Sequence, residues 1–320
     1  MKTARLLLAL ALALSAAQTL HAQATWPDRP VRIVVPLPPG GPSDIVLRAA
    51  IEKMQPAFKQ PLILDNKPGA AGNLGAGEVA RAAPDGTTWL WTTDTLFTVN
   101  PHVYPKLGFK PEDLMPVMRA SAFSQTLVCN PTLGLKTVAD LVARAKSKPM
   151  SYASGGAGSP GHLSTELFKS VAGIDLTHVP YKGPAPAMQD VMGGQVDCGF
   201  LAGPTVLAQV RAGKLVALAV SGAQRSALLP EVPTVAEAGY PGFDATYSLV
   251  LFAPKGTPKP IVDAMFKALE TALRHPDVVE RLRQSDQVVV AASPAESAAR
   301  LAADAKTWGS VARRIGMQAD

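Results

Sequence analysis

Short apolar segments alternate with longer helical stretches along most of this chain. Strands that alternate with helices are typical of an α/β fold built on a mostly parallel sheet. No internal repeat and no low-complexity tract interrupts the pattern. We expect strands at 32–36, 62–65, 89–93, 126–130, 150–154, 177–180, 196–201, 215–221, 246–253 and 287–291.

Several helix starts are marked by a hydroxyl side chain that can cap the first free N–H groups. Proline directly after such a residue suits the first helical position, and an acidic residue three positions on completes a capping box. These features predict where helices begin and do not indicate a function. The expected starts follow Ser159-Pro160, Ser293-Pro294 with Glu296, Thr257-Pro258, and Thr137 with Asp140.

The first residues predict a secretion signal. Lys2 and Arg5 are the only charged residues before Asp28, and residues 6–14 are an unbroken apolar run followed by small and polar residues. A charged start, a short apolar run and a small-residue cleavage zone are typical of a signal peptide. The run is too short for a membrane anchor, which needs about 20 apolar residues. We expect residues 1–24 to be the signal peptide, cleaved after Ala22 or Ala24, and the protein to be periplasmic.

Charge and composition narrow the function. The formal net charge of the 320 residues is +6, and the loss of Lys2 and Arg5 leaves +4, a mild excess that suits an anion. The basic residues form no stripe, so we expect no nucleic-acid partner. The five histidines and two cysteines have no ligand spacing, so we expect no metal and no cofactor. Cys129 and Cys198 could pair or remain buried thiols, and free thiols are favoured.

Glycine and proline residues collect where predicted strands pass into helices, at 38–42, 67–69, 155–161 and 182–184. In open parallel sheets, ligands bind outside the carboxyl ends of the strands. A loop of this kind presents free backbone N–H groups and the positive end of a helix dipole. The chain therefore has several loops suited to an anion.

Gly156-Ala157-Gly158-Ser159-Pro160-Gly161 matches the G-x-G-x-x-G pattern of dinucleotide-binding folds. The next predicted strand ends at 178–181 without an acidic residue for a ribose, which argues against that function. A triphosphate site is excluded because His162 and Leu163 replace the required Lys and Ser/Thr. The remaining interpretation is a glycine-rich loop at a helix start, suited to a carboxylate.

Other candidates have structural alternatives. Asp44 after Ser43 could be part of a helix cap, and Lys182 beside Tyr181 could be a solvated surface residue. His162 could donate to a ligand or be structural. A hydrolase would need a nucleophile and a base, and His162 with Ser159 or Ser154 is the pair to consider, although no G-x-S-x-G or S-x-x-K motif is present.

Ordered sequence blocks resemble the substrate-binding components of tripartite tricarboxylate transporters, also called Bug receptors. The similarity covers essentially the whole mature chain. The blocks are 26–30 (WPDRP), 36–44 (PLPPGGPSD), 65–73 (DNKPGAAGN), 83–86 (APDG), 152–159 (YASGGAGS), 162–163 (HL), 178–183 (HVPYKG), 193–197 (GGQVD), 212–215 (AGKL), 230–239 (PEVPTVAEAG), 253–258 (APKGTP) and 308–309 (WG).

The resemblance implies an α/β, two-lobed periplasmic binding fold of the Venus-flytrap, type II-like kind. Lobe 1 would be 26–125 plus 247–320 and lobe 2 would be 126–246, with crossover strands near Thr126 and Tyr247. It also implies a monomeric receptor, not an enzyme, that delivers a small carboxylate to integral-membrane transporter subunits. The alternatives are an exported sensor or orphan receptor without transport, and a periplasmic hydrolase on the same scaffold.

By the same resemblance, two loops grip the carboxylate, one at 39–44 and one at 154–162, commonly with ordered water. Segments 92–95, 200–203 and 246–248 would line the variable end of the pocket. The chain departs from the usual pattern at 37–38, 58–60, 198–200 and 246–248, which leaves the ligand open. The expected ligand-binding residues are Pro39, Gly40, Gly41, Ser43, Asp44, Thr93, Asp94, Ser154, Gly155, Gly158, Ser159, His162, Tyr181, Lys182, Asp197 and Tyr247.

Overall fold

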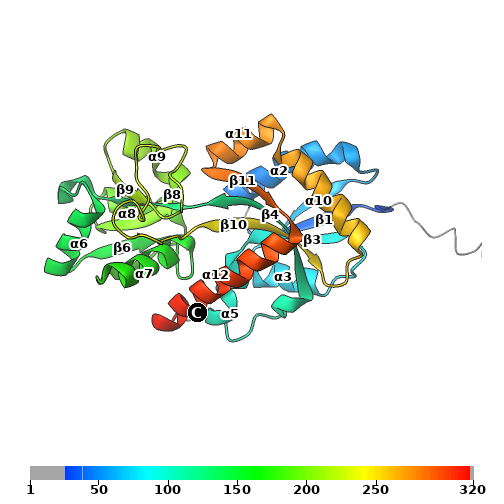
Figure 1. Ribbon diagram of the computed structural model, residues 1–320, viewed down its shortest axis with the longest axis horizontal. Helices are drawn as coiled ribbons and strands as arrows, with labels where there is room; N and C mark the ends of the chain where they lie inside the picture. The colour runs from blue at the N-terminus through cyan, green and yellow to red at the C-terminus, as the bar shows by residue number, and fades with distance from the viewer. Residues whose placement is uncertain (1–25, 38, 318–320) are drawn as a thin grey trace, which may run out of the picture.

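Two separate β-sheets organise the chain, and helices pack on both faces of each. The computed structural model describes residues 26–37 and 39–317, and the predicted signal peptide 1–24 lies outside them. Within these residues the chain forms a six-stranded and a five-stranded sheet. Figure 1 shows an elongated, two-lobed α/β molecule with one sheet in each half. We call the half with the six-stranded sheet the first lobe and the other the second lobe.

The six-stranded sheet is mixed. Its order is β11-β4-β10-β3-β1-β2, and β1 pairs in parallel with β2 and β3 while β10 and β11 pair antiparallel with their neighbours. Its strands are β1 (Val31–Val35), β2 (Leu62–Asn66), β3 (Thr88–Thr93), β4 (Leu114–Phe123), β10 (Tyr247–Pro254) and β11 (Gln287–Ala292).

Alternation along the strands divides the first lobe's apolar side chains between two faces. Ile33 and Trp89 belong to a core cluster that includes residues of α2, α10 and α11, whereas Val34 and Leu90 belong to another that includes residues of α3. Successive strand side chains point to opposite faces, so both faces are buried. The helices of this lobe are α2 (Pro42–Met54), α3 (Asn73–Ala80), α4 (Thr95–Thr98), α5 (Asn100–Val103), α10 (Lys259–Leu273), α11 (Pro276–Gln284) and α12 (Pro294–Arg314).

The five-stranded sheet has the order β7-β6-β8-β5-β9. Strand β6 pairs in parallel with β7 and β8, and β5 is antiparallel to β8 and β9. Its strands are β5 (Gln125–Cys129), β6 (Ser151–Ser154), β7 (Thr177–Pro180), β8 (Cys198–Ala202) and β9 (Val216–Val220). Its helices are α6 (Val138–Ser147), α7 (Pro160–Ala172), α8 (Pro184–Met192) and α9 (Gly203–Arg211).

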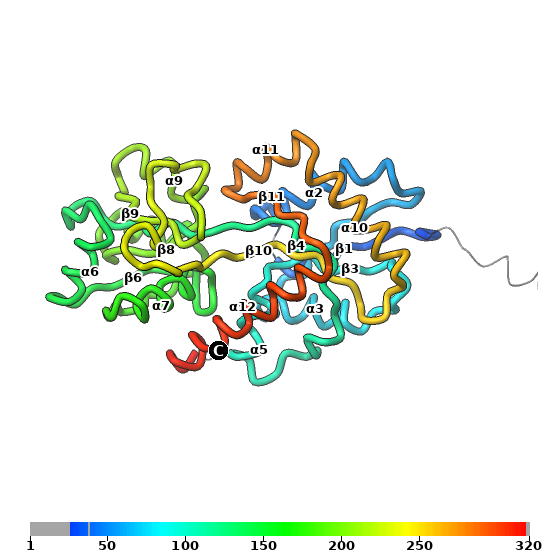
Figure 2. The backbone as a smooth tube through the Cα atoms, viewed as in Figure 1, coloured from blue at the N-terminus to red at the C-terminus, as the bar shows by residue number. Residues whose placement is uncertain are grey.

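Two adjacent segments connect the sheets. Ser124 alone separates β4 from β5, and the return path enters β10 at Tyr247, which pairs with Phe123. Figure 2 shows the two connections running together across the waist. Helix α12 also spans the waist, since it packs on β4 while Trp308 joins the core of the second lobe.

Strand β4 was missed by the sequence analysis. Pro116 and Arg119 interrupt its apolar pattern, and the pairing of β4 with β10 shifts register at two places. A strand is recognised in a sequence by the alternation of apolar and polar residues. Irregular pairing changes which side chains of β4 face the core, so this alternation is absent.

All four predicted helix starts are confirmed, and three of them have the predicted side-chain cap. Ser159 caps α7, and Thr137 and Ser293 each form a capping box, with Asp140 and Glu296 respectively. Helix α10 begins at Lys259 as predicted, but Thr257 does not cap it, because the Thr257 hydroxyl donates back to the Pro254 carbonyl at 2.8 Å.

Candidate functional site

The loop between β1 and α2 is organised by a buried carboxylate. Asp44 is 2% exposed and accepts hydrogen bonds from the Gly40 N–H, Arg48 and Asn66. Burial opposes ionisation, but these hydrogen bonds outweigh it and hold the pKa of Asp44 below its usual range. Gly40 has φ +81°, which glycine adopts without strain. Asp44 therefore shapes the loop from inside.

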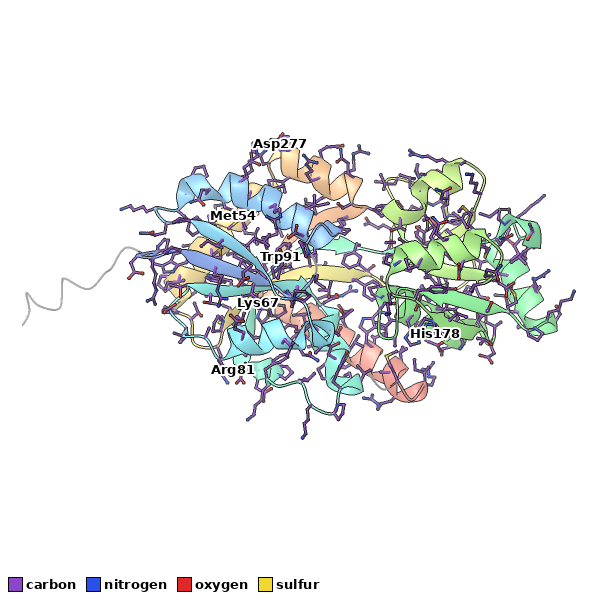
Figure 3. The ribbon with its side chains drawn as sticks, turned by 180° about the vertical axis from the view of Figure 1, so that it is seen from behind. Met54, Lys67, Arg81, Trp91, His178 and Asp277 are labelled. Carbon is purple, nitrogen blue, oxygen red and sulfur yellow. The ribbon has the colours of Figure 1, made fainter. Side chains whose placement is uncertain are left out.

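Ser43, at the same helix start, contacts the neighbouring sheet. It is 9% exposed, and its hydroxyl accepts a hydrogen bond from Trp91 Nε1 at 3.0 Å. Figure 3 shows Trp91 within the first lobe, close to the waist. The Trp91 contact holds the first turn of α2 against the carboxyl end of β3.

The loop between β6 and α7 is organised by histidines. The Ser154 hydroxyl lies 2.7 Å from His178 Nε2 and accepts the Gly156 N–H at 3.1 Å. The Gly158 N–H donates to His162 Nδ1 at 3.0 Å, which assigns the ring proton of neutral His162 to Nε2. The two rings stack with centroids 4.1 Å apart, and Figure 3 shows His178 in the second lobe.

Burial, and then the charge of neighbouring His178, lowers the pKa of His162 to about 3. His162 is therefore neutral at ordinary pH, as its acceptor role toward Gly158 requires. Together with Glu166 and Lys169 it lines a cavity that adjoins the loop cavity described next, with Ala157 and Met317 in both linings. His162 thus supports the loop from behind.

Several cavities lie between the lobes, and both loops reach two of them. One, of about 350 Å³, we call the apolar cavity. The other, of about 480 Å³, we call the loop cavity. The apolar cavity is bordered by both helix starts and by Phe123, Phe200, Leu201 and Leu249. The loop cavity is bordered by parts of 68–72, 93–104 and 155–160. Residues common to both are Leu37, Thr93, Gly155, Ser159 and Pro160.

Five predicted site residues line these cavities. Thr93, Gly155 and Ser159 line both, Ser43 lines the apolar cavity and Gly158 lines the loop cavity. The structure thus brings residues from both lobes around one space. The Thr93 hydroxyl lies 2.8 Å from the Thr95 hydroxyl.

The other predicted residues lie outside the cavity linings, and most have a structural partner. Pro39, Gly40 and Gly41 are in the first loop next to the lining residues, and Lys182 is exposed in the second lobe. Tyr181 donates to Asp190 at 2.6 Å, and burial together with this bond raises the pKa of Tyr181 to about 12. Asp197 accepts from the N–H and hydroxyl of Ser151 at the amino end of β6, whereas the loop 155–159 follows the carboxyl end.

Asp94 and Tyr247 are fully buried supports. Asp94 is 0% exposed and its carboxylate has no hydrogen-bond partner among the described residues. Burial, and then the charge of Asp304, raises the pKa of Asp94 to about 8. The Tyr247 hydroxyl donates to the Pro160 carbonyl at 2.8 Å and lies 2.9 Å from the Ser164 hydroxyl. Tyr247 therefore fixes the start of α7 to the waist.

Sequence reasoning missed part of the cavity lining. The loop after β2 contributes Gly69, Ala71 and Gly72, and a loop before β11 contributes Asp286. The glycine and proline cluster at 67–69 was a usable signal for the first loop. Asp286 follows helix α11 without any local motif, so nothing in the sequence marked it.

Within residues 26–37 and 39–317, no cluster of three or more His, Cys, Asp or Glu side chains could hold a metal ion. In the same part of the chain, none of the helices combines the length and apolar character needed to cross a bilayer.

Known proteins match this chain over most of its length. The family model described as tripartite tricarboxylate transporter family receptor matches residues 46–317. The protein BugT of Bordetella pertussis is 36% identical over 296 residues, which cover 91% of each chain.

Solved structures agree with this match. A protein of R. palustris solved with adipate is 33% identical with a TM-score of 0.80, covering 92% of this chain and 99% of that one. MatC from Rhodopseudomonas palustris, with bound malate, is 32% identical with a TM-score of 0.76, covering 89% and 99%. The periplasmic binding protein BugD is 33% identical with a TM-score of 0.76, covering 92% and 99%. This chain therefore belongs to the tripartite tricarboxylate transporter receptor family.

Proposed function

We propose that this chain is an exported, monomeric, periplasmic receptor that captures a small carboxylate between its lobes. It then presents the ligand to integral-membrane transporter subunits. One observation carries the proposal: the first turns of α2 and α7, which belong to different lobes, line one cavity through Ser43 and Gly161. The adipate- and malate-bound relatives support a carboxylate as the ligand.

The proposed division is 26–125 plus 247–320 for lobe 1 and 126–246 for lobe 2, after a signal peptide at 1–24. The two strand crossings at Ser124 and Tyr247 support these limits. An anion held by both helix starts favours the arrangement in which the lobes face each other, because only that arrangement lets both loops bond it. Each charge-assisted hydrogen bond stabilises the complex by roughly 1.5–3 kcal/mol.

A hydrolase is the less supported function. The serine and histidine that do meet are Ser154 and His178, but Ser154 is 0% exposed and lines neither the apolar cavity nor the loop cavity. Its hydroxyl also accepts the Gly156 N–H, so it holds the loop. This arrangement supports a binding loop better than a nucleophile.

The test is thermal unfolding with a panel of mono-, di- and tricarboxylates. A ligand at 100 times its dissociation constant stabilises a protein by about 2.7 kcal/mol. We expect at least one acid to raise the melting temperature, and Thr93→Leu, which fills the shared part of both cavities, to weaken that response at least about tenfold in affinity. Thr177→Leu, on the exposed start of β7, is the matched control and should respond as the wild type does.

An unchanged melting temperature across the whole panel would contradict carboxylate binding. Transport is tested separately by crosslinking the ligand-bound protein in a native membrane preparation. Recovery of transporter subunits supports the proposal, whereas recovery of a sensor kinase in their place contradicts transport.

A further inference from the structure

The apolar cavity and the loop cavity have an unusual charge for an anion site. Among the described residues, no Arg or Lys lines the apolar cavity or the loop cavity, and Asp286 is the charged side chain that does. A carboxylate bound there can be held by backbone N–H groups and hydroxyls, such as those of Ser43, Thr93 and Ser159. These two cavities therefore have donors for one carboxylate and no lining cation for a second. The arginines nearest to them, Arg119, Arg225, Arg283 and Arg300, line a separate cavity of about 510 Å³ on the other side of Asp286, which borders both spaces.

Asp286 is built into the wall of the apolar cavity. It directly precedes β11 with φ +52°, a conformation that Asp tolerates better than most residues. Its Oδ1 accepts the Ser226 hydroxyl at 2.6 Å, and its Oδ2 is buried without a hydrogen-bond partner in the described chain. A Cβ built on Gly203 would lie 2.1 Å from this Oδ2, so the carboxylate rests against the start of α9 in the opposite lobe.

The rest of the lining suits an apolar ligand body. Leu37, Phe123, Phe200, Leu201 and Leu249 surround the same space. A second carboxylate that extended into this space would lose its hydration among apolar side chains, and it would also meet the like charge of Asp286.

We propose that the ligand is a monocarboxylate with an apolar body, and that Asp286 is the residue that excludes a second carboxylate. This inference rests on the proposed function, because it specifies the ligand of that same site. It predicts that adding one carboxylate to a good ligand weakens binding.

The test uses pairs of acids that differ by one carboxylate: butyrate and succinate, hexanoate and adipate, benzoate and terephthalate. Isothermal titration calorimetry of the wild type should show the monocarboxylate binding at least about tenfold more tightly in the best-binding pair. Asp286→Asn should reduce this ratio to about threefold or less. Asp286 also contacts the opposite lobe, so its substitution can change lobe closure. A change in lobe closure alters the affinities for both acids of a pair alike, whereas exclusion of the second carboxylate changes their ratio.

Asp175→Asn is the matched control, because Asp175 is 95% exposed and lines neither cavity. It should leave the ratio unchanged. A wild type that binds the dicarboxylate as tightly as its partner overturns the inference and leaves the proposed function standing. Binding confined to di- or tricarboxylates also overturns it. Failure of every carboxylate to bind contradicts the proposed function itself.

A second, independent observation concerns the two cysteines. Both are buried free thiols, and they face each other across antiparallel strands β5 and β8. The Asn130 N–H donates to the Asp197 carbonyl at 3.0 Å, which makes Cys129 and Cys198 a non-hydrogen-bonded pair of the ladder. Such pairs have Cα atoms about 4.5 Å apart, within the range of about 4.4–6.8 Å that disulfides span.

The geometry points to a cross-strand disulfide between Cys129 and Cys198 that forms when the chain folds under oxidising conditions. One cysteine thiolate attacks a low-molecular-weight disulfide and releases one small thiol. The second cysteine then displaces the other small thiol, so two protein thiols become one disulfide. Burial, followed by the contact with Cys198, raises the pKa of Cys129 well above its usual value. The thiolate that reacts is therefore scarce in the folded protein, and thiol–disulfide exchange takes place while the chain folds.

The test is to refold the protein in a mixture of reduced and oxidised glutathione, denature it without reductant, and alkylate it. The expected product is a monomer 2 Da lighter than the reduced chain that takes up no alkyl group. Cys198→Ser, as the control, should take up one alkyl group at Cys129. Two alkylated thiols, or only mixed disulfides and disulfide-linked dimers, would overturn this inference.

Discussion

A contact between the lobes makes Gly203→Ala an informative substitution. Gly203 is the first residue of α9, directly after β8, and it lies against Asp286 of the first lobe. An added Cβ would stand 2.1 Å from Asp286 Oδ2, closer than real Cβ contacts allow, and 3.0 Å from its Cγ, which is tighter than most. To restore an ordinary contact, either the lobes separate by about 1 Å at this point or the Asp286 carboxylate turns and gives up its hydrogen bond to Ser226.

The effect should fall on lobe closure and spare the second lobe's own stability. Alanine is a better helix former than glycine by about 1 kcal/mol, so the substitution does not weaken α9. Forcing an extra methyl group into a packed contact costs about 1–3 kcal/mol. If that cost arises only when the lobes are arranged as in the structure, ligand affinity should fall by about 5- to 150-fold.

Calorimetric titration with the best ligand of the carboxylate panel measures this loss. The matched variant is Asp286→Gly, which removes the side chain that the new methyl group meets, and glycine accepts the φ of +52° at this position. The double variant should bind within about threefold of Asp286→Gly alone. Wild-type affinity in Gly203→Ala, or no rescue in the double variant, would refute the reasoning that this contact accompanies ligand capture.

Three further substitutions test buried groups, and urea unfolding measures all of them. Tyr247→Phe removes the hydroxyl that meets the Pro160 carbonyl and the buried Ser164 hydroxyl, so the free energy of unfolding should fall by about 1–3 kcal/mol, and an unchanged value would contradict the role of this bond. Asp44→Asn should lower it by about 1 kcal/mol or more at pH 7. Hydrogen bonds lower the pKa of Asp44 in the folded protein, so the stability difference between Asp44→Asn and the wild type should shrink as the pH falls from about 4, the unfolded pKa, through the folded pKa. A stability difference that stays constant over this range would contradict the role of these hydrogen bonds. The free energy of unfolding of Asp94→Asn, measured relative to that of the wild type, should rise by about 1 kcal/mol or more between pH 4 and pH 8.5. The reason is that the folded pKa of Asp94 is about 8, so the wild type loses the stability contributed by the protonated carboxyl group as the pH rises. A difference that does not change with pH would contradict a protonated Asp94 in the folded protein.

Local signals in the sequence determined much of the scaffold. The capping residues Ser159, Ser293 and Thr137 act within one turn of the chain, so their neighbours in sequence suffice to predict them. Glycine and proline runs at strand ends likewise marked the loops that border the cavities, since positive-φ turns and helix starts are local properties. Most strands and the two loops that border the cavities were therefore accessible from local sequence, whereas the division into two lobes was expected only from the family resemblance, and the mixed pairing of both sheets replaces the mostly parallel sheet that the pattern predicted.

Tertiary contacts decided what the sequence left open. His162 stands in a loop motif suited to a ligand, yet stacking on His178 and the bond from the Gly158 N–H turn it to the back of that loop. Strand β4 is defined by irregular pairing with β10, which no local period reveals. Asp286 reaches the cavity because the lobes meet there. Each of these outcomes depends on residues far apart in the chain, whereas pattern and propensity describe only neighbours. The three-dimensional arrangement alone therefore settles which side chains face the cavities between the lobes.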